Sequence, residues 1–169
     1  MRSCSGRVEA GMGSEGESDS RLAGIRGFRP EDISELVSIT EESTQSASWS
    51  RESYEKLCKL EGFLAFVNET AGCISGFVAG RQVVDEGEIL NLAVRRQNWR
   101  RGEGHALLSA ILEQLHRRGV NKVFLEVRES NEAGITFYEK MGFAKTGRRP
   151  GYYREPEEAA VLMEKILTG

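Results

Sequence analysis

The stretch "NWRRGEGHALLSAILEQLHRRG", residues 98–119, decides the fold, because a turn of arginines and glycines runs directly into a helical pattern. The pattern ends at Gly119, a residue typical of helix C-termini. Apolar, β-branched runs at 87–94 and 120–127 flank the helix, so the three segments form a βαβ unit with parallel strands. One helix face carries all the apolar residues of the pattern, at i, i+1, i+4, i+5 and i+8: Leu107, Leu108, Ile111, Leu112 and Leu115.

The turn before this helix predicts a phosphate site. A helix N-terminus leaves amide N–H groups without partners and carries about half a positive charge. Gly102 and Gly104 let a ligand approach these amides, and Arg100 and Arg101 add charge. The turn lacks the Lys-Ser/Thr pair of a P-loop, and Leu107 stands where the dinucleotide motif needs a third glycine. A plain strand-to-helix connection remains the alternative.

The remaining elements follow from periodicity and turn signals. We expect one α/β (α+β) domain, residues 21–169, with about seven strands and about four helices. Residues 1–20 are rich in Gly and Ser and are expected to form a disordered N-terminal extension. Before the βαβ unit we expect a strand over 22–30, helices over 31–43 and 48–57 (the second capped by Ser50), and two strands within 62–84 joined at Ala71–Gly72. After it we expect a helix over 130–142 capped by Ser130 or Asn131. The last two expected strands, 143–149 and 159–167, lie on either side of a polar, aromatic loop.

Composition limits the function classes. The net charge of -3 gives no general electrostatic case for binding nucleic acid. No apolar run approaches the roughly 20 residues of a membrane span, and we expect no signal peptide. The three cysteines are odd in number and lack metal spacing, and there are two histidines. We therefore expect a reduced, cytoplasmic protein with no disulfide framework and no metal.

Three motifs resemble those of the GNAT superfamily of N-acetyltransferases. They are "RRGEG" at 100–104 after "NLAV", "LEVRESN" at 125–131 and "FYEKMGF" at 137–143. Over residues 22–167 the chain is most similar to the RimI-type ribosomal-protein-alanine N-acetyltransferases. The resemblance implies a central mixed, twisted sheet with a splayed pair of parallel strands.

The resemblance also implies that the ligand is acetyl-coenzyme A, with coenzyme A as product. The pyrophosphate would lie on the amides of the turn, the pantetheine along the preceding strand, and an asparagine would bond the pantetheine arm. This family turn usually begins with Gln or Arg, where this chain has Trp99. The implied cofactor residues are Leu92, Ala93, Val94, Arg100, Arg101, Gly102, Glu103, Gly104, His105 and Asn131.

Glu126 and Tyr138 are the candidate catalytic residues. Acetyl transfer to an amine needs a base, N–H donors for the carbonyl oxygen and an acid for the thiolate. Glu126 stands near the end of a strand between Leu125 and Val127, which point to the opposite face. An ion pair with Arg128 or Arg95 is its structural alternative, and core packing is that of Tyr138. The resemblance assigns Glu126 as proton acceptor and Tyr138 as proton donor, with direct transfer in a ternary complex.

The acceptor site is predicted from aromatic residues. Trp49, in "SWS", and Tyr152 and Tyr153, in the expected loop, could wall a groove for an extended protein N-terminus. Packing is the alternative for each. The resemblance implies the N-terminal alanine of ribosomal small-subunit protein eighteen as substrate. Two other functions stay open: acetylation of a small-molecule amine, and non-catalytic sensing of acyl-CoA.

Overall fold

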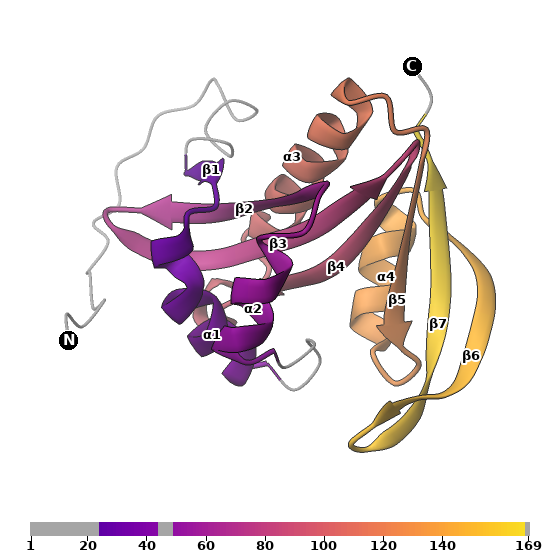
Figure 1. Cartoon of the computed structure of the whole chain (residues 1–169). Helices are drawn as coiled ribbons and strands as arrows, with labels where there is room; N and C mark the ends of the chain where they lie inside the picture. The colour runs from indigo at the N-terminus through magenta and orange to yellow at the C-terminus, as the bar shows by residue number, and fades with distance from the viewer. Residues whose placement is uncertain (1–23, 44–48, 168–169) are drawn as a thin grey trace, which may run out of the picture.

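The computed structural model describes residues 24–43 and 49–167 (Figure 1). The expected extension at 1–20 lies outside these ranges. Within them, seven strands form one sheet in the order β1-β2-β3-β4-β5-β7-β6. The strands are β1 Ile25–Gly27, β2 Phe63–Thr70, β3 Cys73–Val83, β4 Glu86–Val94, β5 Lys122–Arg128, β6 Ala144–Arg154 and β7 Glu157–Ile166. The helices are α1 Ile33–Glu41, α2 Arg51–Leu57, α3 Glu103–Arg117 and α4 Glu132–Lys140, with short 3-10 turns η1 Pro30–Asp32 and η2 Arg96–Asn98.

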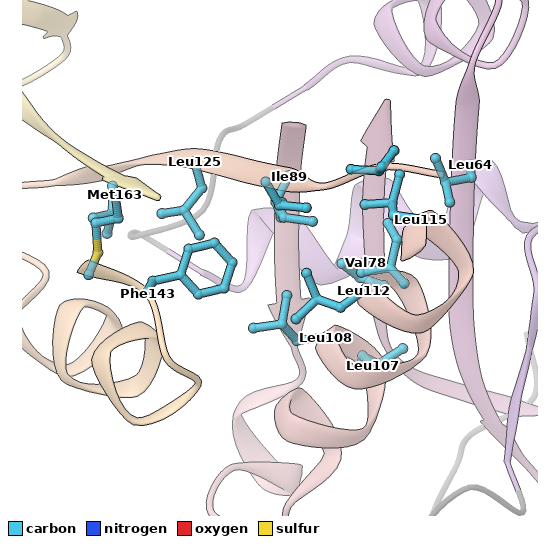
Figure 2. Close-up of a cluster of buried hydrophobic side chains, with 14 of the residues drawn as sticks. Leu64, Val78, Ile89, Leu107, Leu108, Leu112, Leu115, Leu125, Phe143 and Met163 are labelled. Carbon is cyan, nitrogen blue, oxygen red and sulfur yellow. The ribbon is translucent and has the colours of Figure 1, made fainter. Parts of the chain in front are cut away.

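Two helical layers sandwich the sheet. Helices α1 and α2 lie on one face, over β2, β3 and β4, and α3 and α4 lie on the other face (Figure 1). The apolar stripe of α3 is buried and packs against β2, β3 and β4 (Figure 2). The mixed sheet with helices on both faces confirms the expected fold class, including the parallel pairing of β4 with β5.

The parallel pair β4 and β5 separates halfway along. The two strands pair only from Glu86 to Ile89 on β4. On the other side of β4 the register with β3 skips one residue, because Gly80 faces Ile89 and Ala79 faces Asn91. Leu90 is therefore the extra residue of a β-bulge, which bends a strand and interrupts its ladder. The last residues of β4, from Leu90 to Val94, therefore have no partner on β5.

The end of the sheet differs from the expectation. Strand β6 continues to Arg154, so Tyr152 and Tyr153 lie in a strand and the expected loop is wrong. The ladder to β7 is irregular between Arg149 and Tyr153, and this irregularity accommodates Pro150. Because β6 is the edge strand, a proline without an N–H group is tolerated there.

The cysteines also differ from the expectation. Cys73, at the start of β3, is disulfide-bonded, so the prediction of a chain without disulfides is wrong at this position. Cys58, after α2, is free and partly buried.

Candidate active site

The end of β4 presents backbone groups to an open edge. The amide of Arg95 donates to the carbonyl of Ser75 on β3 at 2.7 Å. In an antiparallel ladder the backbone groups of successive residues point alternately to the two sides. The groups of Ala93 therefore face β3, whereas those of Leu92 and Val94 face the gap left by β5. Of the three predicted strand residues, two offer backbone hydrogen bonds to a ligand in this gap.

The glycine turn has the predicted amide cradle. Gly102 caps α3 with φ +82°, a left-handed conformation that suits glycine, and Arg100 also has a positive φ of +61°. The amide of Ala106 donates to the Gly102 carbonyl at 3.0 Å. Within the described residues, no acceptor binds the amides of the preceding first turn, Glu103, Gly104 and His105. Arg100, Arg101 and His105 are exposed around these amides.

The Glu103 side chain is held by the protein. Its carboxylate accepts hydrogen bonds from the Ser75 hydroxyl at 2.5 Å and from Asn98 Nδ2 at 2.7 Å. An acid in the first turn also suits the positive end of the helix dipole. The side chain thus ties the turn to β3 and η2, and the Glu103 amide remains available.

Gly104 connects the cradle to the open edge. A Cβ placed on it would lie 3.7 Å from the Phe137 ring of α4 and 4.0 Å from Val94 Cγ2. The helix N-terminus, the end of β4 and one face of α4 therefore meet at one point.

Trp99 occupies the end of the open edge. Its indole N–H donates to the Val94 carbonyl at 2.7 Å, and the Arg96 guanidinium lies 5.9 Å from the ring centre. The indole is 52% exposed. The Trp99 side chain thus satisfies one of the edge carbonyls.

Asn131 caps α4. Its Oδ1 accepts from the amide of Gly134 at 2.9 Å, which decides between the two predicted caps, Ser130 and Asn131. Its Nδ2 group has no acceptor among the described residues and is available to a ligand.

Glu126 is paired with a cation that sequence reasoning missed. Arg149 Nη1 on β6 lies 2.8 Å from Glu126 Oε1. The two predicted partners bind elsewhere: Arg128 pairs with Glu158 at 3.2 Å, and Arg95 pairs with Glu35 at 2.7 Å. The Arg149 pair crosses β7, so no local spacing could have indicated it.

The two tyrosines of β6 lie beside Glu126. The interaction of the Tyr152 hydroxyl with the Glu126 carboxylate, together with burial, raises the pKa of Tyr152 to about 12. Burial also raises the pKa of Tyr153, whose ring lies 4.1 Å from the Arg128 guanidinium. Tyr153 interacts electrostatically with both Glu126 and Tyr138, so it lies near both candidate catalytic groups.

Tyr138 is packed between the aromatic rings of Phe137 and Phe143, at 5.2 and 5.8 Å between centres. Burial raises the pKa of Tyr138 far above its usual value. The hydroxyl therefore keeps its proton to a higher pH than an exposed tyrosine does.

Trp49 belongs to the packing of the other helical layer. It contacts Tyr54 edge to face at 5.4 Å, beside the cluster that α1 and α2 form with the sheet. No contact between Trp49 and the β6 tyrosines occurs in the described part of the chain. Residues 44–48, next to it, lie outside that part.

Residues 24–43 and 49–167 contain neither a metal-ligand cluster nor a membrane-spanning helix. No group of three or more His, Cys, Asp or Glu side chains there could hold a metal ion. No helix there is long and apolar enough to cross a membrane.

A splayed pair of parallel strands beside a glycine-rich helix N-terminus is typical of acyl-transferring enzymes. The chain belongs to the acetyltransferase (GNAT) family, whose family model matches residues 32–143. It is an acyltransferase. The [ribosomal protein bS18]-alanine N-acetyltransferase of Escherichia coli K12 is 34% identical over 73% of this chain and 84% of that protein.

Solved structures of other acetyltransferases have the same fold. The crystal structure of the Escherichia coli ribosomal-protein-S18-alanine N-acetyltransferase has a TM-score of 0.77 at 30% identity, covering 86% of this chain and 95% of that one. The PaiA N-acetyltransferase of Thermoplasma acidophilum, in complex with coenzyme A, shares the fold, with a TM-score of 0.70 at 21% identity over 85% of this chain and 98% of that one.

Proposed function

We propose that this protein transfers an acetyl group from acetyl-coenzyme A to the α-amine of a protein N-terminus, the N-terminal alanine of ribosomal small-subunit protein bS18. The observation that carries the proposal is the open edge of β4, which meets the unpaired first-turn amides of α3 beside Glu126 and Tyr138. The relatives named for this reaction support the choice of acceptor. Because that acceptor is a ribosomal protein, we propose that the enzyme works in the cytoplasm.

The cofactor fits the groups present. The amides of Glu103, Gly104 and His105, with Arg100 and Arg101, would hold its pyrophosphate. The edge groups of Leu92 and Val94 and the Asn131 amide would hold its pantetheine arm. When bound, acetyl-coenzyme A supplies an activated acetyl thioester.

Each chemical requirement has a candidate group in the chain. Glu126 accepts the proton of the acceptor amine, and an edge N–H of β4 stabilises charge on the carbonyl oxygen. Tyr138 donates a proton to the leaving thiolate. Cys73 is disulfide-bonded and cannot act as a thiolate nucleophile, which supports direct transfer in a ternary complex.

An α-amine suits a single carboxylate base better than a lysine does. The two amines differ by about 2.4 pKa units, or roughly 3.3 kcal/mol in deprotonation at neutral pH. Tyr152 and Tyr153 of the β6–β7 hairpin interact with Glu126, which supports a groove for an extended N-terminus on this hairpin.

The test is acetyl-coenzyme A turnover against a panel of N-terminal peptides, a polyamine and free amino acids. The proposal expects kcat/KM for an alanine-starting bS18 peptide to exceed that of every small amine. Preference for a small amine would assign the protein to the alternative enzyme class. Tight binding of the cofactor without turnover on any acceptor would make it a sensor.

A further inference from the structure

The carboxylate of Glu126 is not free in the structure. Arg149 lies 2.8 Å from it, and the two side chains differ in exposure: 18% for Glu126 and 53% for Arg149. The Tyr152 hydroxyl also interacts with this carboxylate. Glu126 is therefore fixed on a central strand, whereas the guanidinium can withdraw into solvent.

The register of the sheet explains why Arg149 reaches Glu126. Arg149 is opposite Ala160 of β7, which is opposite Arg128 of β5, so Arg149 shares the face of Arg128 and Glu126. Its neighbour Arg148 points to the other face, where it makes two bonds to Glu129 at 2.7 and 2.8 Å. The side chains of the adjacent residues Arg148 and Arg149 thus lie on opposite faces of the sheet.

Arg149 also contacts the proposed acceptor groove. Its guanidinium lies 5.2 Å from the ring centre of Tyr152. An acceptor that reaches Glu126 along this ring meets the guanidinium first. At neutral pH the acceptor's α-amine, with a pKa near about 8, arrives mostly as a cation. Two cations then compete for one carboxylate.

We propose that Arg149 is the resting counter-ion of Glu126 and that the α-ammonium of the acceptor displaces it. The site thereby exchanges one cation for another, and the carboxylate is never left uncompensated. Arg149 is a positioning residue that acts through Glu126. This inference rests on the proposed function.

Binding to a protein saturated with coenzyme A tests the exchange without turnover. Calorimetry compares an alanine-starting bS18 peptide with the same peptide already N-acetylated, which lacks the ammonium. Arg149→Gln should tighten the free-amine peptide about two- to fivefold, the strength of a partly exposed ion pair, and leave the acetylated peptide unchanged. Arg149→Lys keeps a cation and should resemble the wild type. Equal changes for both peptides, or weaker binding of the free-amine peptide, would overturn the proposal.

Two controls separate this inference from the proposed function. Arg148→Gln removes the same charge from the same strand on the opposite face and should not alter the difference between the peptides. In a Glu126→Gln background, Arg149→Gln should give no further tightening, and a gain there would refute action through Glu126. If Glu126→Gln loses turnover while Arg149→Gln binds both peptides like the wild type, only the counter-ion role fails. If Glu126→Gln keeps full turnover, the proposed base fails and the inference fails with it.

Discussion

At the residue scale, Glu126 and Tyr138 stand in opposite surroundings. Glu126 lies beside the Arg149 cation at the edge of solvent. Tyr138 is enclosed by aromatic rings, and burial raises its pKa. Glu126 is thus held by a counter-ion, whereas Tyr138 retains its proton in an aromatic enclosure.

Replacing each group separately should give two different pH profiles. Glu126→Gln and Tyr138→Phe should each lower kcat by roughly 10²- to 10⁴-fold. Raising the pH should partly restore Glu126→Gln, because more acceptor is already neutral above the amine pKa of about 8. It should not restore Tyr138→Phe, since a raised pKa means that the wild-type hydroxyl stays protonated there and its loss is not replaced by base. The measurement is turnover from about pH 6 to 9.5. Near-normal activity in both variants would leave positioning as the main catalytic effect.

Trp99 should report cofactor binding. Its half-exposed indole bonds the Val94 carbonyl at the open edge. A ligand in that edge should shield the ring and shift its fluorescence to shorter wavelength. The experiment titrates coenzyme A into a Trp49→Phe variant, so that Trp99 is the remaining tryptophan of the two. A saturable binding isotherm by calorimetry with an unchanged emission spectrum would place the cofactor away from this edge.

At the element scale, α3 packs closely against the sheet because glycines face it. A Cβ on Gly80 would lie 2.8 Å from Ile111 Cδ1 and 2.8 Å from the Glu88 carbonyl oxygen. A Cβ on Gly76 would lie 3.2 Å from Leu107 Cδ1. The same helix carries the amide cradle at its N-terminus, so this packing also sets the position of the cofactor site.

Gly80→Ala should push α3 away from β3. We expect a loss of about 1–3 kcal/mol in the free energy of unfolding, the usual cost of overpacking a core. Gly27→Ala is the matched control, because its added methyl group on β1 meets no atom within 4 Å. Urea denaturation measures both. A Gly80→Ala protein as stable as the control would show that the helix can shift at no cost.

At the scale of the whole molecule, a partly buried ion pair joins the first strand to the helical layer. Asp32 accepts two bonds from Arg26 on β1, at 2.8 and 2.9 Å, and one from the Arg29 amide at 2.7 Å. The Arg26 guanidinium holds the pKa of Asp32 below its usual value. Because the folded-state pKa is lowered, the stabilisation is present above the unfolded value of about 3.9 and is lost as the pH falls through the folded value.

Asp32→Asn should therefore lower stability in a pH-dependent way. At pH 7 we expect a loss of roughly 1.5–3 kcal/mol, the strength of hydrogen bonds to a charged group. As the pH falls through the lowered folded-state pKa of Asp32, the wild type itself becomes protonated, so the difference between the two proteins should shrink. Urea unfolding at several pH values measures this, and a constant difference would refute the assigned charge.

Sequence reasoning succeeded where structure depends on local periodicity. The α3 stripe, the Ser50 cap and the Ala71–Gly72 turn are all as predicted. It failed where pairing between distant segments decides. Pro150 and Gly151 predict the end of a strand, yet β6 continues through both because it is the edge strand of the sheet.

The features of the candidate site also differ in whether the sequence alone predicts them. The cradle amides follow from the helix start, and they could be predicted from the glycines and arginines. The splay of β4 depends on a bulge at Leu90, and it was expected only through the family resemblance. The Arg149 partner of Glu126 depends on registers across three strands, which no spacing along the chain indicates.

Acetyl transfer to an α-amine is tested most directly by finding which amine of the product carries the acetyl group. The protein is incubated with acetyl-coenzyme A and an alanine-starting bS18 peptide that also contains a lysine, and fragment mass spectrometry then locates the acetyl group. A second sample uses the same peptide with its N-terminus already blocked. We expect one acetyl group on the α-amine of the first peptide and none added to the second. Acetylation of the lysine in both samples, or of neither peptide, would contradict it.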